Sequence, residues 1–255
     1  MRRPQVKIGV TVIPNIFTVL NMFFGFLAIV MITQGEFGKG AWLILAAAFF
    51  DLMDGNLARL FNTPTKFGIE FDSIADLVSF CVGPAILVYF AYVDGLNPLL
   101  AAVISFIPLF FGGIRLARFN VITSKHPLPF YLGLTTTAMA VIMASFVLFN
   151  LKLNGTAGDP RIALPLVFLL SYLMISPVRY GKVPNIKKVL DNKLFLFYVG
   201  LGFISVLFFG SMAFFPMSIL YVLWGLINWV IHHNIYEMEL KVKPVTSINK
   251  KRKME

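Results

Sequence analysis

Apolar stretches recur along almost the whole chain and are separated by short polar connections. Because the hydrocarbon core of a bilayer requires about 20 consecutive apolar residues in a helix, each stretch predicts a membrane-spanning helix. The expected spans are 10–33, 41–60, 72–93, 97–118, 131–150, 161–177, 195–209 and 213–231. The pattern therefore predicts an all-α fold, a polytopic transmembrane helical bundle of about eight helices.

Composition supports this interpretation. Hydrophobic residues make up 58% of the chain and charged residues 13%, whereas soluble domains are roughly half apolar and about a quarter charged. The basic opening resembles a signal peptide, but its apolar run continues to Thr33 without a small-residue cleavage site, so we expect a retained first helix. The single cysteine, Cys81, lies in an apolar run, which excludes an internal disulfide and a cysteine metal cluster.

The distribution of basic residues tests the helix count and predicts orientation. Eight spans place both termini and every second connection on one face, and that face collects 19 of the 22 Lys and Arg residues. Only Lys39, Lys152 and Arg161 fall on the other. We therefore expect both termini in the cytoplasm, a membrane domain over 1–240 and a basic cytoplasmic tail over 241–255. The net charge of +10 does not indicate nucleic acid, because the basic residues lie between apolar runs and meet anionic lipid headgroups.

Four acidic residues lie in or at the edge of two neighbouring apolar helices: Asp51, Asp54, Asp72 and Asp76. An unpaired charge costs about 2.5–3.5 kcal/mol at the centre of a membrane helix. Their spacing puts each pair on one helix face, and the two helices meet at one surface, so both pairs can point into one cleft. An all-oxygen set selects hard cations such as Mg²⁺, Mn²⁺ or Ca²⁺, and Mg²⁺ completes its shell with water and phosphate oxygens. The pattern indicates phosphate chemistry.

The residues beside these aspartates fit a phosphate ligand but also fit simpler roles. Gly55 and Ala58 would let a bulky ligand approach the helix backbone, and Arg59 adds a cation for phosphate. Taken alone, an aspartate pair in a membrane helix is equally typical of an ion pathway, and a glycine is typical of helix packing. At this level a cation transporter or channel stays open as an alternative.

The spacing of eight residues resembles the signature of the CDP-alcohol phosphatidyltransferase family at every fixed position. The residues are Asp51, Asp54, Gly55, Ala58, Arg59, Gly68, Asp72 and Asp76. The resemblance implies a core of six transmembrane helices, usually a homodimer, with two divalent cations, Mg²⁺ or Mn²⁺, at the cytoplasmic boundary of the cell membrane. It also implies roles: Asp51, Asp54 and Asp72 as metal ligands, Asp76 near the metals and acting as the base, and Gly55, Ala58, Arg59 and Gly68 around the CDP moiety. A transporter would give no reason for Arg59, Gly68 or the gap of eight residues before Gly68.

The first helix is similar to the family's opening segment. Its Asn15, Thr18 and Asn21 recur every three residues and form one polar stripe that suits nucleotide contacts. Hydrogen bonding between helices explains the same stripe equally well.

Other segments resemble the phosphatidylserine synthase branch of the family: FGIEFDSIADLVSFCVGPA, RLARFN from Arg115, FYLGL from Phe130 and SYLMISPVRY. The segment GLTTTA departs from that branch, which commonly has a proline after Gly-Leu, and this puts the local backbone in doubt. The branch implies CDP-diacylglycerol and L-serine as substrates and CMP as a product.

A serine acceptor needs a cation for its carboxylate, and Arg115 and Arg118 at the cytoplasmic end of the fourth helix are the candidates. Snorkelling and topology explain these arginines equally well. Glycerol 3-phosphate or inositol phosphate as acceptor, an archaeal-type lipid donor, and a catalytically silent homologue stay open. His126, His232 and His233 have no assigned role, although the last two are expected to mark the membrane interface after the final span.

Overall fold

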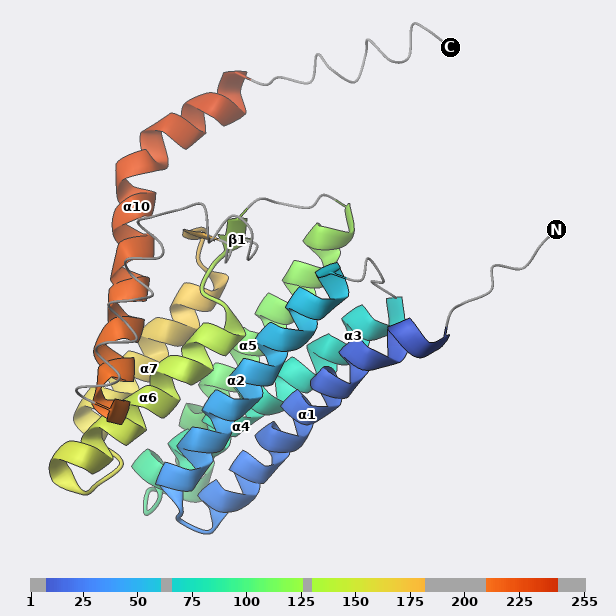
Figure 1. Cartoon of the computed structure of the whole chain (residues 1–255). Coiled ribbons are helices and arrows are strands. Elements are labelled where there is room, and N and C mark those ends of the chain that lie inside the picture. Colours follow the sequence, from blue (N-terminus) through green and yellow to red (C-terminus); the bar gives the residue numbers. More distant parts are fainter. Residues whose placement is uncertain (1–7, 61–65, 126–129, 182–209, 243–255) are drawn as a thin grey trace, which may run out of the picture.

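Long helices dominate the computed structural model and pack into one bundle, as the apolar stretches predict (Figure 1). The structure describes residues 8–60, 66–125, 130–181 and 210–242, with only the backbone described at 8–15, 57–60, 66, 122–125 and 232–242. Within these ranges a helix covers most of each predicted span. The span predicted at 195–209 lies outside the described residues, as do His126 and the tail beyond Val242.

The bundle is built from helices that run back and forth between two ends. Helices α1 (Ile8–Thr33) and α2 (Phe37–Leu60) pack antiparallel across a short turn. A continuous helical segment follows, made of α3 (Lys66–Asp76), the π-helical turn η1 (Leu77–Val82), α4 (Gly83–Val88) and a second π-helical turn, η2 (Tyr89–Val93). The remaining helices are α5 (Pro98–Lys125), α6 (Thr136–Asn154), α7 (Pro160–Ile175), the short 3₁₀ turn η3 (Gly210–Ala213) and α10 (Phe214–Val242). Helix α10 stands at the side of the bundle, where it contacts α6 (Figure 1).

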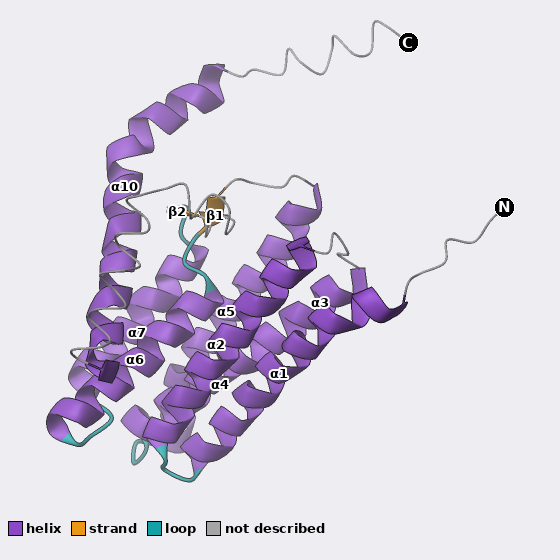
Figure 2. Ribbon diagram, in the orientation of Figure 1, coloured by secondary structure: helices purple, strands orange, loops and turns teal. Residues whose placement is uncertain are grey.

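The prediction that a helix begins at 131 is wrong. Residues Phe130–Leu132 form strand β1, which lies beside β2 (Arg179–Gly181) (Figure 2). The two strands pair antiparallel, with Tyr131 opposite Tyr180. Helix α6 starts only at Thr136, because Gly133 has a φ of 74° and the Thr135 side chain accepts a hydrogen bond from the Ala138 amide as an N-cap. A short apolar run such as FYL fits a strand and a helix equally well.

Two helices extend farther than their apolar spans. Helix α5 continues from the predicted end at 118 to Lys125, and α10 continues from 231 to Val242. His232 and His233 therefore lie within a helix rather than after it. Hydropathy marks the part of a helix that lies in the hydrocarbon layer, while polar residues continue the same backbone hydrogen bonding beyond it. The predicted domain boundary at 240 stays a prediction.

Five helical segments in the described residues are long and apolar enough to cross a membrane: Ile16–Thr33, Phe67–Val93, Pro98–Val121, Thr136–Asn154 and Gly210–Ile231. Helix α2, which carries Asp51 and Asp54, packs against α1 and α6. Large apolar side chains such as Phe26, Leu99 and Trp224 are exposed on the outside of the bundle, which suits contact with lipid. The chain is a polytopic helical membrane protein.

Small residues allow the continuous segment from Lys66 to Val93 to pack closely against its neighbours. A Cβ atom at Gly25 of α1 would lie 2.1 Å from Ser79 Oγ, and one at Gly112 of α5 would lie 2.4 Å from Cys81 Sγ. Close approach of this kind is typical of membrane helices, whose association depends on packing rather than on the hydrophobic effect. It fixes the segment between α1 and α5.

Gly133→Ala is expected to destabilise the protein strongly. The positive φ at Gly133 costs a non-glycine residue about 1–3 kcal/mol, and its Cβ would also lie 2.2 Å from the main-chain oxygen of Met174. Thermal unfolding of the detergent-purified protein measures the effect. Gly35→Ala is the matched control, because Gly35 has a φ of 80° and no described atom within 4 Å of its added Cβ. Equal shifts in melting temperature for the two variants would contradict the steric argument at Gly133.

Candidate active site

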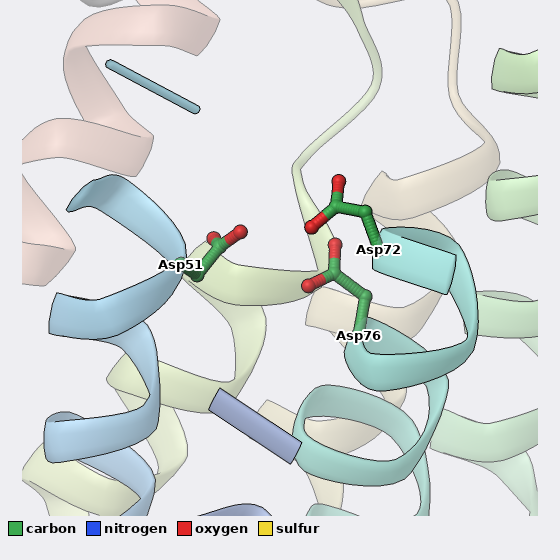
Figure 3. A group of neighbouring side chains, drawn as sticks. All are labelled: Asp51, Asp72 and Asp76. Carbon is green, nitrogen blue, oxygen red and sulfur yellow. The ribbon is translucent and has the colours of Figure 1, made fainter. Parts of the chain in front are cut away.

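Three aspartates from two helices face one another at one end of the bundle. Asp51 comes from α2, and Asp72 and Asp76 lie one turn apart on α3, with their carboxylates directed toward each other (Figure 3). One carboxylate oxygen from each lies within 4.8 Å of the others. The two helices meet here because α2 ends and α3 begins at this end, as the sequence predicts.

Asp54 lies beside this group rather than in it. Its side chain is buried, and its Oδ2 accepts a hydrogen bond of 2.9 Å from Thr18 Oγ1 of α1. Asp51 Oδ2 accepts a hydrogen bond of 3.1 Å from Thr137 Oγ1 of α6. All four predicted aspartates line one cavity, but the close oxygen cluster is made by Asp51, Asp72 and Asp76.

Asn21 supports Asp76 from α1. Asn21 is fully buried, and its Nδ2 donates to Asp76 Oδ1 over 3.2 Å, while its main-chain oxygen accepts from Ser79 Oγ over 2.9 Å. The polar stripe predicted to contact nucleotide therefore makes interhelical hydrogen bonds to aspartates through Thr18 and Asn21. Asn15 belongs to the backbone-only part of α1, so its predicted role stays a prediction.

A cavity of about 920 Å³ opens in front of the aspartates. A pocket of this size suits a drug-sized ligand. Its lining also comes from α5, β1, α6 and α10, whose polar and aromatic contributors include Arg115, Phe119, Asn120, Tyr131, Thr135, Thr137, Ser218 and Tyr221. Gly55, Leu52 and Ile69 also line the cavity, and the last two are exposed apolar side chains. The cavity therefore has acidic side chains in its lining and exposed apolar side chains, Leu52 and Ile69, beside them, which suits contact with lipid.

The two arginines predicted to bind an acceptor carboxylate lie in different surroundings. Arg115 lines the cavity, is only 7% exposed, and donates from Nη1 to Thr136 Oγ1 over 3.2 Å. Its guanidinium lies 5.7 Å from the centre of the Phe119 ring. Arg118 is not among the described residues that line the cavity, and its Nη1 donates to the main-chain oxygen of Ile175 at the C-terminal end of α7 over 3.0 Å. Of these two arginines, Arg115 is the one that lines the aspartates' cavity.

Comparison with known proteins places this geometry in a family. Residues 11–229 match the family model of CDP-alcohol phosphatidyltransferases. The chain belongs to this family. A relative from Helicobacter pylori named CDP-diacylglycerol–serine O-phosphatidyltransferase is 37% identical over 219 residues, which are 85% of this chain and 90% of the relative.

Archaeal relatives match over similar or shorter lengths. A CDP-diacylglycerol–serine O-phosphatidyltransferase from Methanocaldococcus jannaschii is 31% identical over 218 residues, 84% of this chain and 92% of the relative. An archaetidylserine synthase from Methanothermobacter thermautotrophicus is 34% identical over 175 residues, 67% of this chain and 70% of the relative. The names of these relatives share serine and differ in the lipid.

The acidic cluster of this CDP-alcohol phosphatidyltransferase fits a divalent cation. Asp72 Oδ1 is buried and has no hydrogen-bond partner among the described residues, which is costly for a carboxylate oxygen. Hard cations bind oxygen ligands at about 2.0–2.6 Å, so oxygens on opposite sides of one ion lie at separations comparable to the 4.8 Å limit found here. All three contributing side chains offer oxygen, as such cations prefer.

Several remaining signature residues keep their predicted roles as predictions. Ala58 and Arg59 lie in the last turn of α2, where only the backbone is described. Gly68 lies in the first turn of α3, one turn before Asp72, and Gly55 follows Asp54 and lines the cavity. These positions keep the signature residues at the same end of the bundle as the acidic cluster.

The sequence reasoning missed the contribution of Thr136 and Thr137. These residues hold Arg115 and Asp51 respectively, although nothing in their spacing marks them as site residues. The only signal is the segment GLTTTA, which departs from the related branch by a missing proline and whose threonines supply the hydroxyl groups. Tyr131 and Tyr221 were missed as well, because one lies on an unpredicted strand and the other on the final helix.

Proposed function

We propose that this chain is a phosphatidylserine synthase, which transfers the phosphatidyl group of CDP-diacylglycerol to the hydroxyl of L-serine and releases CMP. The observation that carries the proposal is the shared cavity, in which a cluster of three aspartates faces a buried arginine. The first group suits a metal-bound pyrophosphate and the second suits the carboxylate of an amino acid. The family membership and the names of the relatives support the same reaction.

Asp51, Asp72 and Asp76 would hold the cations, with Asp54 close by, and the family resemblance implies two ions, Mg²⁺ or Mn²⁺. When bound, such ions polarise the phosphorus that is attacked and neutralise charge on the leaving CMP. The chain's own contribution is to fix the carboxylates. Thr18, Asn21 and Thr137 each hold one of these aspartates by a hydrogen bond.

Asp76 is the proposed general base. In the reaction the serine hydroxyl oxygen forms a bond to the β-phosphorus of CDP-diacylglycerol, the bond from that phosphorus to the CMP oxygen breaks, and the hydroxyl proton passes to the base. A base must lie within hydrogen-bond reach of that hydroxyl. Asp76 lines the cavity, and Asn21 restrains one of its two oxygens, which leaves the carboxylate oriented before substrate binds.

Arg115 is the proposed partner of the serine carboxylate. Its Nε is buried and makes no hydrogen bond among the described residues, so an entering carboxylate would satisfy a donor that is otherwise unpaired. Thr136 and the Phe119 ring hold the guanidinium in place. Arg118 fits a different role, because a cation at the C-terminal end of a helix stabilises that end.

The proposed setting is the cytoplasmic membrane, with the active site and both termini facing the cytoplasm and the protein acting as a homodimer. The cavity lies at the end of the bundle opposite Lys39, Lys152 and Arg161, which begin or end α2, α6 and α7. Those three residues are the ones that charge sorting assigns to the outer face. Leu52 and Ile69 beside the cavity would let the acyl chains remain in the bilayer.

An acceptor panel tests the proposal. We expect detergent-purified protein with CDP-diacylglycerol and Mn²⁺ or Mg²⁺ to release CMP with L-serine, and to release far less with glycerol 3-phosphate, inositol phosphate or ethanolamine. Ethanolamine is the sharpest comparison, because it keeps the hydroxyl and ammonium of serine and lacks only the carboxylate assigned to Arg115. Chelation of the metal should stop CMP release. Equal rates with serine and ethanolamine would remove the carboxylate site from the mechanism.

A second lipid donor is supported by one specific comparison, the similarity to an archaetidylserine synthase. CDP-archaeol in place of CDP-diacylglycerol in the same assay separates the two donors. A cation transporter would instead carry ions across sealed vesicles without releasing CMP.

A further inference from the structure

Three consecutive hydroxyl groups begin helix α6 at the edge of the cavity. Thr135 is the N-cap and accepts from the Ala138 amide over 3.0 Å. Thr136 accepts from Arg115 Nη1 over 3.2 Å, and Thr137 donates to Asp51 Oδ2 over 3.1 Å. The first turn of α6 therefore contacts both the acidic cluster, through Asp51, and Arg115.

The contact of Thr137 restricts the acidic wall. Asp51 belongs to the group of three carboxylates, and a hydroxyl bonded to one of its oxygens limits rotation of the carboxylate plane. Partners of this kind orient the side chains that bind a metal, and their loss typically lowers metal affinity or activity by about 10–100-fold. The hydroxyl of Thr137 is the only part of that side chain that a valine would lack.

The contact of Thr136 restricts the arginine. Thr136 and Arg115 are both buried, so the bond between them lies away from water. A hydrogen bond to a charged group in such a place holds its partner more firmly than a surface contact does. Arg115 thereby keeps its guanidinium against α6 while Nε stays without a described partner.

We propose that the first turn of α6 is a shared positioning element, in which Thr137 orients Asp51 for metal binding and Thr136 orients Arg115 for the acceptor. The acceptor half of this inference rests on the proposed function, whereas the metal half rests on the acidic cluster alone. Because the two threonines are neighbours on one helical turn, that single turn sets the position of Asp51 relative to Arg115. Neither residue is assigned contact with substrate, so both are positioning residues.

Isosteric substitutions separate the two roles. Thr137→Val is expected to weaken Mn²⁺ binding by about 10–100-fold while the KM for serine at saturating Mn²⁺ stays close to the wild-type value. Thr136→Val is expected to raise the KM for serine by about tenfold, the effect of losing roughly 1.4 kcal/mol from a hydrogen bond to a charged group, with Mn²⁺ binding unchanged. Binding of Mn²⁺ to the full chain in detergent is measured by electron paramagnetic resonance, which requires no turnover.

Matched variants control for packing and for folding. Thr137→Ser and Thr136→Ser keep the hydroxyls and should restore most of each lost property. Thr33→Val loses a hydroxyl bonded within its own helix to the Val30 main-chain oxygen at an exposed position away from the cavity, so both readouts should stay unchanged. Melting temperatures of all variants show whether each remains folded.

The inference is overturned if the two valine variants change metal binding and serine KM together, or if neither changes its assigned property. The inference is also overturned if Thr137→Ser and Thr136→Ser are folded but do not restore the property that the matching valine variant loses. Wild-type protein that releases no CMP with serine would instead refute the proposed function and with it the Thr136 half. Binding of Mn²⁺ would then still decide the Thr137 half.

Discussion

Replacement of Asp76 by asparagine is expected to lower CMP release by about 10²–10⁴-fold, the usual contribution of a positioned general base. The amide keeps the size of the carboxyl group and removes both its charge and its capacity to take a proton. Asp76 also shares the oxygen cluster with Asp51 and Asp72, so the variant should bind Mn²⁺ more weakly. Turnover is therefore measured at saturating Mn²⁺ and saturating CDP-diacylglycerol, where loss of the base remains and loss of metal affinity is compensated.

Asp94→Asn is the matched control for Asp76. Asp94 is an exposed aspartate in the connection between η2 and α5 and does not line the cavity, so turnover should stay at the wild-type level. Near-normal turnover in the Asp76 variant would remove Asp76 from the role of base. Full recovery at high Mn²⁺ would leave it as a metal ligand only.

Replacement of Arg115 by glutamine is expected to raise the KM for serine by about 10- to 150-fold. This range corresponds to the roughly 1.5–3 kcal/mol that a hydrogen bond to a charged group contributes. The KM for CDP-diacylglycerol should change little, because Arg115 is buried, whereas the apolar side chains expected to meet the lipid, Leu52 and Ile69, are exposed. Initial rates of CMP release, with each substrate varied in turn, separate the two constants.

Arg118→Gln is the matched control, one turn farther along the same helix. Because Arg118 donates to the main-chain oxygen of Ile175, its loss should lower the melting temperature and leave the serine KM nearly unchanged. Equal effects of the two variants on the serine KM would contradict the assignment of Arg115. Equal effects of Arg115→Gln on both substrates would place that residue outside the acceptor site.

The helical architecture was predictable because hydropathy reports directly on the bilayer. Helix positions and the meeting of α2 with α3 follow from apolar runs, and a helix covers most of each described span, although α6 begins at Thr136 rather than at 131. The strand Phe130–Leu132 was not predictable in this way, since its partner Arg179–Gly181 lies about one helical hairpin away in sequence. Pairing between distant segments leaves no local periodicity when each strand is so short.

The aspartates that form the acidic cluster were predictable from the sequence, but the side chains that hold them were not. Spacing placed all four aspartates in two facing pairs, and the structure brings Asp51, Asp72 and Asp76 together with Asp54 beside them. Spacing in the sequence could not show that Thr18 would hold Asp54 against α1, because that contact depends on the packing of two helices. The same limit applies to Arg115 and Arg118, which share a helix end and a charge but meet different neighbours.

The π-helical turn that follows Asp76 bears on how this helix can be compared among relatives. In η1 the Gly83 amide donates to the oxygen of Val78, five residues earlier, so the turn accommodates more residues than an α-helical turn. One residue corresponds to about 100° of rotation in an α-helix, and the turn therefore sets the angular register between α3, which carries the aspartates, and α4, which packs on α5. A relative that lacks one residue between 77 and 82 can match one half of this helix only if an alignment gap is opened there. An alignment without this gap would pair either the aspartates of α3 or the packing residues of α4 with the wrong residues of the relative.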